Sequence, residues 1–510
     1  MTLAFVVLLT VFLPSQGLPV EDDISGRYDM RIVDSIHGSP KLNTNHVRVL
    51  SGQKLSQIHQ PSEGLNDVEG TYEADMKLKP LQESEIMDGV HALDGVGRSK
   101  RKVVNNLDYV WPKGIVVFKF NDLANVLPND IKKTVRSAIE NWERTTCIRF
   151  LEMSEGVKSQ VGHSNYVIFS KGAGCSSYVG MVNDGPQEIT ISENCNNVVS
   201  IAHEIGHSLG FYHEQSRPDR DYFVNIINEN IKPGFEGDFK KYDRQTINTR
   251  EMYDVGSAMH YGPTWFSKDN NAHTIEPKDK GLMGIMGQRD ELSFIDIKTA
   301  NELYKCNAGC PARLDCKNEG YIGPNCTCVC PYALSGKKCE EVKRGTPGCG
   351  GILTETSGTF SSPNFPGNYA ENADCYWLIQ ATPKSDITVR FDTFEVEDDG
   401  SICSFDWLEI RKYGVGLSGP KVCTEKHGSE TYLTLKNDQF IHIMSNAIEF
   451  QSTPLKGQRV QRNDHCDQLF CGNGPSAPIV YSGPALILHF HSDEHHTFKG
   501  FRATYTITPK

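Results

Sequence analysis

The chain has 510 residues, too many for one ordinary domain, so several folded domains are expected. Its hydrophobic content of 38% is ordinary for globular protein. The 52 basic and 64 acidic residues give a formal net charge of -12, which disfavours nucleic-acid binding through a basic patch.

An apolar run opens the chain, from Leu3 to Leu13, and small or polar residues follow it up to Gly17. The run is too short to span a bilayer and lies where a secretory signal lies. We therefore expect residues 1–17 to be a signal peptide and the protein to be secreted to the extracellular space. A buried N-terminal strand is the alternative. No later run of about 18 apolar residues predicts a membrane anchor.

The cysteines indicate the compartment as well. They number 16, none precedes Cys147, and six crowd between Cys310 and Cys339. An even count behind a signal peptide predicts disulfide bonds in an oxidising compartment. Metal-binding thiols are disfavoured, because no two CxxC pairs stand at the spacing of a zinc ribbon.

A segment without cysteines, residues 18–101, ends in the basic string Arg98-Ser99-Lys100-Arg101. Processing proteases of the secretory pathway have acidic pockets that pair with such cations. We expect a propeptide over 18–101 that is removed by cleavage after Arg101. An exposed basic turn is the alternative.

Residues 102–306 read as an α/β unit. Apolar periodicity predicts strands at 115–120 and 167–169 and helices at 129–150, 197–209 and 296–304. The cysteine-rich stretch that follows is too short for a hydrophobic core and depends on its disulfides. After a linker at 341–348, short alternating segments such as 387–391, 407–410 and 485–490 predict an all-β sandwich.

The strongest chemical signal is an H-E-x-x-H sequence formed by His203, Glu204 and His207, followed by Gly210 and His213. Histidines four residues apart lie on one face of a helix and can share a metal. Gly210 can end the helix with a positive φ, so that His213 swings round as a third ligand.

Three nitrogen ligands leave a coordination position open for water, as catalytic zinc requires. Zinc lowers the pKa of that water, and Glu204 can take its proton. We therefore expect one Zn2+ per subunit. The alternative, a helix with surface histidines, is disfavoured because the extended motif is far more specific than H-E-x-x-H alone.

Downstream, Ser257-Ala258-Met259-His260-Tyr261 supports this interpretation. Met259 can supply the apolar floor beneath the metal, although a methionine in an apolar stretch is usually a core residue. The Tyr261 phenol can reach the metal or a developing oxyanion.

These motifs, with Gln215-Ser216-Arg217-Pro218-Asp219-Arg220 after the third histidine, resemble the astacin family of metalloendopeptidases over about 200 residues. The resemblance implies a zincin-type, metzincin α/β (α+β) catalytic domain. It implies that His203, His207 and His213 bind zinc and that Glu204 is the general acid/base. It also implies that Tyr261 stabilises the tetrahedral intermediate and that Glu214 contacts the new amino terminus after activation. Family disulfides map to Cys147–Cys306 and Cys175–Cys195.

Tyr72-Glu73-Ala74-Asp75 resembles the inhibitory F-x-G-D motif of astacin propeptides, in which the aspartate takes the place of water on zinc. A carboxylate is a good zinc ligand and blocks the position of the nucleophile. Here tyrosine replaces phenylalanine and alanine replaces glycine, yet Asp75 is retained.

Residues 307–340 resemble an EGF-like domain, whose usual pairing implies Cys310–Cys326, Cys316–Cys328 and Cys330–Cys339. The spacing alone allows 15 connectivities. Asn325-Cys326-Thr327 is a candidate glycosylation sequon, with cysteine at its middle position.

The C-terminal part contains Cys349-Gly350-Gly351, Ser362-Pro363-Asn364-Phe365-Pro366, the stretch 403–410 and Gly500-Phe501. Through these pieces residues 349–507 resemble a CUB domain with an insertion, which implies Cys349–Cys375. Two pairings stay open for the remaining four cysteines: Cys403–Cys471 with Cys423–Cys466, or Cys403–Cys423 with Cys466–Cys471. Many CUB domains bind Ca2+ through acids that match Glu397, Asp406 and Asp493, and solvated surface carboxylates are the alternative. Nearby His489, His491, His495 and His496 are better explained by alternation on a strand and its turn than by metal binding.

The sequence thus predicts a secreted zinc endopeptidase, made as a zymogen, that hydrolyses extracellular, matrix or cuticle proteins. Its tail resembles that of nematode astacins, and its CUB domain is expected to hold protein partners. One alternative is a binding or adhesion protein that acts through its EGF-like and CUB modules. Another is zinc-dependent hydrolysis of a non-protein substrate.

Overall fold

The computed structural model describes most of the chain from residue 103 to 417, with short gaps, the strands at 421–422, 431–435, 439–444 and 447–448, and residues 478–510. Before these ranges it describes residues 71, 73–79 and 82. The predicted signal peptide, Arg101, and the cysteines Cys403, Cys423, Cys466 and Cys471 lie outside the described residues. Among the helices that are described, none is long and apolar enough to cross a membrane.

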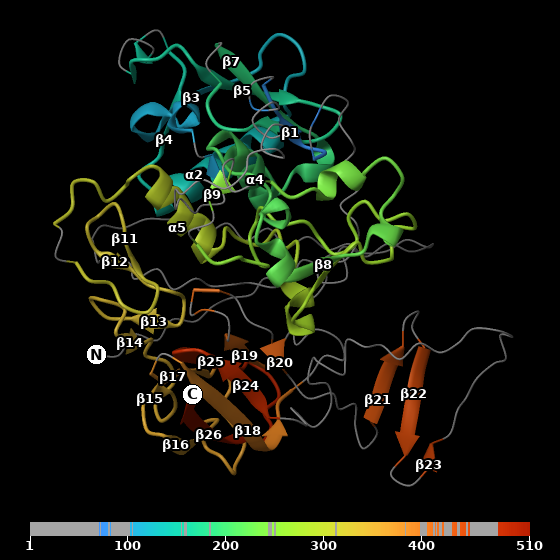
Figure 1. Cartoon of the computed structure of the whole chain (residues 1–510), viewed down its shortest axis with the longest axis vertical. Coiled ribbons are helices and arrows are strands. Elements are labelled where there is room, and N and C mark those ends of the chain that lie inside the picture. The colour runs from blue at the N-terminus through green and yellow to red at the C-terminus, as the bar shows by residue number, and fades with distance from the viewer. Residues whose placement is uncertain are drawn as a thin grey trace, which may run out of the picture. The chain divides into compact units, whose positions relative to one another are not determined.

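A four-stranded parallel sheet organises residues 103–306, with the strand order β4-β3-β5-β7. The strands are β3 (Ile115–Phe120), β4 (Arg149–Glu152), β5 (Tyr166–Lys171) and β7 (Pro186–Ile191). Helices α2 (Asn129–Thr145) and α4 (Val198–Ser208) share one apolar core with the sheet (Figure 1). The Trp142 indole joins the helices by donating to the Ala202 carbonyl at 3.0 Å.

The helix predicted over 129–150 is too long by five residues at its end. Thr146 turns its hydroxyl back to the Trp142 carbonyl at 2.6 Å, and Thr145 does the same to Asn141 at 2.8 Å. Such side chains compete with the helical backbone for its carbonyls. Helix α2 ends at Thr145, and Phe150 is a buried residue of strand β4 instead. The predicted helix is too long because the apolar residues of helix α2 and of strand β4 follow one another closely in the sequence.

Two short strands from before residue 105 pair with strands that lie between residues 177 and 248. Strand β1 (Met76–Lys77) runs parallel to β6 (Ser177–Tyr178), and β2 (Val103–Val104) runs antiparallel to β9 (Ile247–Asn248). Gly210, just past α4, has a φ of 104°, and a Cβ there would lie 2.8 Å from Val104 Cγ2. Glycine at this position therefore allows both the positive φ that ends the helix and the close packing of strand β2.

A second apolar core lies around β8 (Val224–Ile226) and β10 (Ile275–Pro277), which pair antiparallel. Helix α5 (Phe294–Leu303) completes this part of the chain and begins two residues before the predicted start. Its capping box joins Ser293 and Asp296, each side chain accepting from the backbone of the other residue. A disulfide joins Cys147 to Cys306, and another joins Cys175 to Cys195.

Residues 310–342 form two small hairpins held by disulfides. The hairpins are β11 (Tyr321–Ile322) with β12 (Cys328–Val329), and β13 (Leu334–Ser335) with β14 (Glu341–Val342). The disulfides are Cys310–Cys326, Cys316–Cys328 and Cys330–Cys339. Asn325 is exposed in the turn between β11 and β12.

The C-terminal part is a β-sandwich, as its alternating segments predict. One sheet has the order β15-β17-β25-β19-β20 and the other β16-β26-β18-β24, with an apolar core between them. The first consists of β15 (Gly351–Leu353), β17 (Asp374–Gln380), β25 (Ala485–His491), β19 (Trp407–Arg411) and β20 (Lys421–Val422). The second consists of β16 (Ser357–Ser361), β26 (Gly500–Pro509), β18 (Ser385–Glu395) and β24 (Ile479–Ser482). Cys349 is bonded to Cys375.

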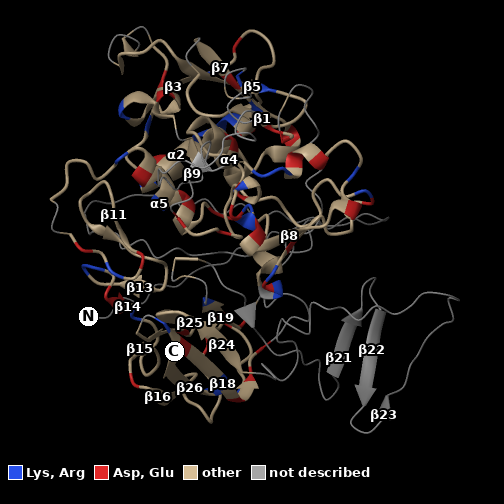
Figure 2. Cartoon of the chain, viewed as in Figure 1, with Lys and Arg blue, Asp and Glu red and all other residues tan. Residues whose placement is uncertain are grey.

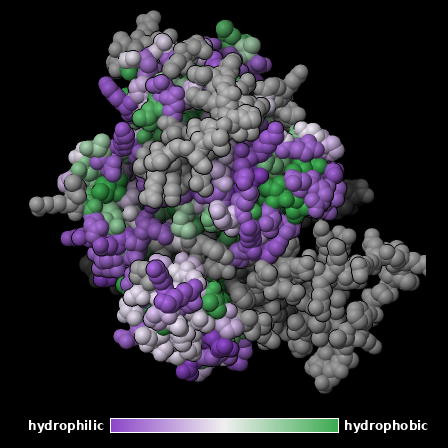
Figure 3. Space-filling model, viewed as in Figure 1, coloured by the Kyte–Doolittle hydropathy of each residue, from purple (hydrophilic) through white to green (hydrophobic). Residues whose placement is uncertain are grey.

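The segment between β20 and β24 carries a further antiparallel sheet of β21 (Thr431–Leu435), β22 (Gln439–Met444) and β23 (Ala447–Ile448). Across the described parts of the chain, acidic and basic residues are interspersed (Figure 2). On the face in view, hydrophobic areas are small and bordered by hydrophilic residues (Figure 3).

Candidate metal centre

Helix α4 presents the first two predicted ligands. The Asn197 side chain caps it by accepting from the backbone of Val199 and Ser200, which fixes where the helix begins. His203 and His207 lie one turn apart, so their rings point to the same side, with 3.0 Å between the Nε2 atoms.

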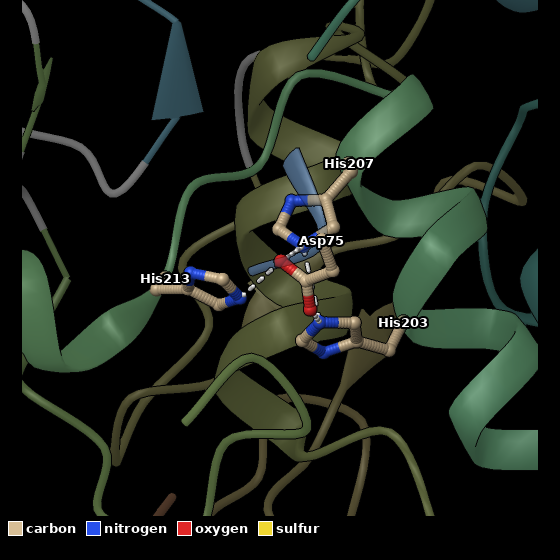
Figure 4. Close-up of side chains that lie close together, drawn as sticks. All are labelled: Asp75, His203, His207 and His213. Atoms are coloured by element: carbon tan, nitrogen blue, oxygen red, sulfur yellow. Dashed lines mark hydrogen bonds and ion pairs between the residues drawn. The ribbon is translucent and has the colours of Figure 1, made fainter. Parts of the chain in front are cut away.

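His213 arrives from the turn that follows Gly210, and its ring lies 5.4 Å from that of His203 and 4.8 Å from that of His207, between centroids. Asp75 completes the cluster from the N-terminal segment. Its Oδ2 lies 3.2 Å from His203 Nε2, and its Oδ1 lies 3.6 Å from His207 Nε2 and 3.2 Å from His213 Nε2 (Figure 4). All four side chains are buried. The sequence had named all four, and the fold brings them together.

The hydrogen bonds of the two Nδ1 atoms determine which nitrogen of each ring can bind a metal. His203 Nδ1 lies 2.7 Å from the Ala258 carbonyl, and His207 Nδ1 lies 2.8 Å from the Phe211 carbonyl. A carbonyl only accepts, so both Nδ1 atoms carry the hydrogen and both Nε2 atoms present a lone pair to the centre. Two lone pairs 3.0 Å apart repel unless a cation lies between them.

The remaining atoms at the centre fit the same interpretation. Asp75 Oδ1 and His213 Nε2 are buried and 3.2 Å apart, and among the described residues neither makes a hydrogen bond of good geometry. Converging imidazole nitrogens and a carboxylate are the donor set that Zn2+ takes in tetrahedral sites. The four residues therefore fit a zinc ion, with Asp75 in the position that a catalytic site keeps for water or substrate.

The charges around the centre shift its protonation. Burial lowers the pKa values of His203 and His207 below the ordinary range, which keeps them neutral as ligands must be. Burial also lowers the pKa of His213, but the facing carboxylates of Asp75 and Glu73 outweigh it and raise the value to about 9. The carboxylates of Asp75 and Glu73 thus stabilise a positive charge at His213, and a bound metal ion would supply one.

Glu204 is buried beside the cluster. Burial and the negative charge of Asp75 raise its pKa well above the usual range of a carboxyl group, while Arg289 and Lys77 oppose the shift. A buried carboxyl group with a strongly shifted pKa next to a metal site is a candidate acid or base.

Met259 and Tyr261, from the downstream motif, both lie beside the histidine cluster. A Cβ at Gly206 would lie 3.0 Å from the Met259 sulfur, so the methionine packs directly under the helix between its two histidines. The Tyr261 hydroxyl donates to the Glu73 carbonyl at 2.9 Å, and its ring packs 4.7 Å from that of His213. The tyrosine therefore contacts the N-terminal segment that carries Asp75.

Glu214 is buried in an ionic network. Its Oε1 accepts from Arg217 Nη1 at 2.9 Å and from the Asp254 backbone at 2.8 Å. Arg217 also binds Asp219 with two parallel bonds of 2.9 and 2.8 Å. The predicted contact of Glu214 with a new amino terminus belongs to the cut chain, and Lys102 lies outside the described residues.

Three residues near the site had no predicted role. Asp296 accepts from the Ser257 hydroxyl at 2.6 Å and the Ala258 backbone at 2.9 Å, so α5 holds the turn that carries Met259. Arg289 packs on the Trp265 ring and brings positive charge near Glu204. Glu73 binds His213, as argued below. A capping-box pattern was the available signal for Asp296, and no pattern pointed to the other two.

In the C-terminal sandwich, Glu397, Asp406 and Asp493 offer carboxylate oxygens that all lie within 4.8 Å of one another. Tyr369 donates to Asp406 Oδ2 at 2.5 Å, and the Asp493 backbone donates to Oδ1 at 2.8 Å. Burial raises the pKa of Asp406 to about 6. The neighbouring histidines have acidic partners: His489 and His491 bind Asp374 at 2.9 and 3.0 Å.

Comparison with known families agrees with this geometry. Residues 103–305 match the model of the astacin peptidase family, and residues 349–453 match the CUB domain model. Blastula protease 10 of Paracentrotus lividus is 34% identical over 86% of this chain. Zinc metalloproteinase nas-30 of Caenorhabditis elegans is 42% identical over 77%, and nas-36 of Brugia malayi is 32% identical over 72%. The chain spans 64%, 51% and 63% of the lengths of these relatives, less than two thirds of each.

Among solved structures, high choriolytic enzyme 1, a hatching-enzyme zinc protease of Oryzias latipes, is 32% identical. The match covers 39% of this chain and 95% of that one, with a TM-score of 0.35. The CUB2 domain of MASP-1 bound to Ca2+ is 19% identical over 32% of this chain and 99% of that one, with a TM-score of 0.19. The two family models thus identify residues 103–305 as a peptidase domain of the astacin family and residues 349–453 as part of a CUB domain.

Proposed function

We propose that this protein is a secreted zinc endopeptidase, made as a zymogen, that hydrolyses peptide bonds of extracellular proteins such as matrix or cuticle components. One observation carries the proposal: three histidine Nε2 atoms converge on the Asp75 carboxylate, and the segment that carries it continues as strand β1 along the edge of β6. We further propose residues 1–17 as the signal peptide, 18–101 as the propeptide cut after Arg101, and 307–340 as an EGF-like domain with a glycosylation candidate at Asn325.

The backbone contacts of the prosegment support a protein substrate. Strand β1 lies along the edge of β6, where the Ser177 backbone donates to the Asp75 carbonyl at 2.8 Å and Val179 donates to Lys77 at 3.3 Å. Such an edge binds an extended chain through main-chain bonds that any sequence can make. An unfolded stretch of another protein can form the same bonds once the prosegment leaves.

When bound by His203, His207 and His213, zinc supplies the Lewis acidity that makes water nucleophilic at neutral pH. Glu204 takes the proton of that water and later gives it to the leaving amine. Burial and the charge of Asp75 both raise the pKa of Glu204, so departure of the prosegment removes the second of these causes and lowers that pKa.

Tyr261 stabilises the developing oxyanion through its hydroxyl. In the uncut chain this hydroxyl already donates to a peptide carbonyl, that of Glu73. A substrate carbonyl that takes the same place gains the bond as its charge develops, when the bond is worth most.

The CUB domain, which we propose extends over 349–507, is assigned the capture of protein partners and a Ca2+ site at Glu397, Asp406 and Asp493. Oxygen ligands from three acids suit this cation. The pairing of Cys403, Cys423, Cys466 and Cys471 plays no part in the proposal.

The test is hydrolysis of a denatured protein by recombinant chain cut after Arg101. We expect activity only after cutting, lost with Glu204→Ala and with a zinc chelator, and restored by added Zn2+. Glu193→Ala is the matched control, since this exposed glutamate pairs with Lys171. A cut, zinc-loaded protein that is inert on several substrates would contradict the proposal and favour a binding or adhesion protein acting through its C-terminal modules.

A further inference from the structure

The three histidines differ in what holds their outer nitrogen. His203 and His207 donate from Nδ1 to the backbone carbonyls of Ala258 and Phe211, which are permanent parts of the catalytic domain. His213 donates instead to a side chain of the prosegment, Glu73, whose Oε2 lies 2.8 Å from Nδ1. A partner of this kind fixes the tautomer and the orientation of a metal-binding imidazole.

The Glu73 side chain is buried and accepts a hydrogen bond at each of its two carboxylate oxygens. Its carboxylate is 1% exposed, and its second oxygen, Oε1, accepts from the Ser216 hydroxyl at 2.7 Å. The carbonyl of the same residue accepts from Tyr261 at 2.9 Å. Burying a carboxylate is costly unless donors replace its water, so this set of donors marks a specific seat for an acidic side chain.

Asp75 and Glu73 approach His213 from opposite sides of its ring, at Nε2 and Nδ1. The result is a carboxylate–histidine pair of the kind that supports catalytic zinc sites, with the carboxylate on the part of the chain that activation removes.

We propose that Glu73 is a positioning residue for zinc, which holds His213 in its metal-binding orientation and makes the uncut chain bind zinc more tightly than the cut enzyme. The inference rests on the proposed function, since it assumes that the histidines bind zinc. The prosegment then does two separate things. Asp75 blocks the open position, and Glu73 secures a ligand while the protein folds and acquires its metal.

The experiment measures zinc affinity by competition with a chromogenic chelator. The full-length chain is kept uncut by Arg101→Ala and compared with Glu73→Ala and Glu73→Gln in the same background. We expect Glu73→Ala to weaken zinc binding by about 10–100-fold, as loss of such outer partners commonly does, and Glu73→Gln to weaken it less, because its amide oxygen still accepts. Lys79→Ala, in the same segment with its ammonium over the Tyr178 ring, is the control expected to stay within about twofold of its parent.

The Asp75→Ala variant distinguishes a direct effect of Glu73 on His213 from a loss of zinc caused by general destabilisation of the prosegment. If Glu73 acts only by keeping Asp75 in place, Glu73→Ala adds nothing to Asp75→Ala. If it acts through His213, the double variant binds zinc more weakly than Asp75→Ala alone. An unchanged zinc affinity of uncut Glu73→Ala, or no added effect in the double variant, would overturn the inference.

The cut protein provides an internal control. When Arg101 is retained and the prosegment is cut and separated, wild type and Glu73→Ala have the same sequence and must show the same zinc affinity and activity, which verifies that the catalytic domain folded. An active, chelator-sensitive cut enzyme with an unaffected Glu73→Ala zymogen refutes this inference alone. A cut wild type that is inert with zinc refutes the proposed function instead.

Discussion

The Tyr261 hydroxyl donates a hydrogen bond of 2.9 Å to the carbonyl oxygen of Glu73. The partner is a peptide carbonyl, the same group that a protease must polarise, and it is supplied by the segment that carries Asp75. The ring itself is fully buried against His213, Trp265 and Phe266, so the hydroxyl is held in place by packing.

Tyr261→Phe keeps that packing and removes only the hydroxyl. We expect kcat of the cut enzyme to fall on the order of 100-fold with little change in KM, because the lost donor acts mainly on charge that develops during reaction. Steady-state kinetics and zinc content check this together. An equal rise in KM at constant kcat would instead assign the tyrosine to ground-state binding.

Asp75→Ala in a chain kept uncut by Arg101→Ala opens the position that the carboxylate fills. We expect the uncut variant to hydrolyse a small peptide substrate, where uncut parent protein does not, since the three histidines and Glu204 remain in place. Asp279→Ala, at an acid that is not part of the cluster of Asp75 and the three histidines, is the control. An uncut Asp75→Ala variant with no activity would show that the prosegment blocks the site sterically without this ligand.

Ala74→Gly tests the one departure from the inhibitory motif that the structure describes. Ala74 has a φ of 67°, in the left-handed region that costs an L-residue roughly 1 kcal/mol more than glycine. Its methyl group is buried, which offsets part of that gain. We expect a modestly more stable uncut chain with a higher Tm. A lower Tm would mean that burial of the methyl group outweighs the backbone strain.

Arg217→Leu should destabilise the catalytic domain by about 3–5 kcal/mol, because it leaves the buried Glu214 carboxylate without its cation. Arg217→Lys keeps the charge but loses the two-bond contact with Asp219, so an intermediate loss is expected. Urea unfolding of all three proteins gives the comparison. Equal stabilities of the leucine variant and wild type would exclude a structural role for the network.

The acidic cluster of the CUB domain predicts a stabilising effect of Ca2+ that depends on pH. The folded pKa of Asp406 is raised from an ordinary 3.8 to about 6 by burial, so without the ion its contribution to stability is present at low pH and lost as pH rises through about 6. Calcium binds the charged form and should raise Tm at pH 7 much more than at pH 5.

Asp406→Asn is expected to abolish the calcium effect at both pH values, with Asp392→Asn in strand β18 as the control. Thermal unfolding in calcium and in chelator measures each case. If calcium does not change the Tm of the wild type at pH 7, the three acids are solvated or hydrogen-bonded carboxylates and do not form a calcium site.

Local patterns predicted the elements well where one residue pattern mapped to one element. Strand β3, helix α4 and strand β25 fall at the predicted places, because their apolar residues are bounded by caps or turns. The helix over 129–150 was wrong at its end, since threonine back-bonding at Thr145 and Thr146 is not visible as a change of apolar spacing.

The sequence by itself determined the candidate metal ligands. Spacing on one helix places His203 and His207 together, the extended motif adds His213, and the resemblance to a propeptide motif adds Asp75. Tertiary structure decided what supports them. Asp296 reaches the Met259 turn from another helix, and Glu73 reaches His213 across 140 residues of chain. Such contacts join residues distant in sequence, and their geometry depends on how the backbone closes. A sequence pattern therefore identifies the candidate ligands, whereas the hydrogen bonds that orient them can be read only from the fold.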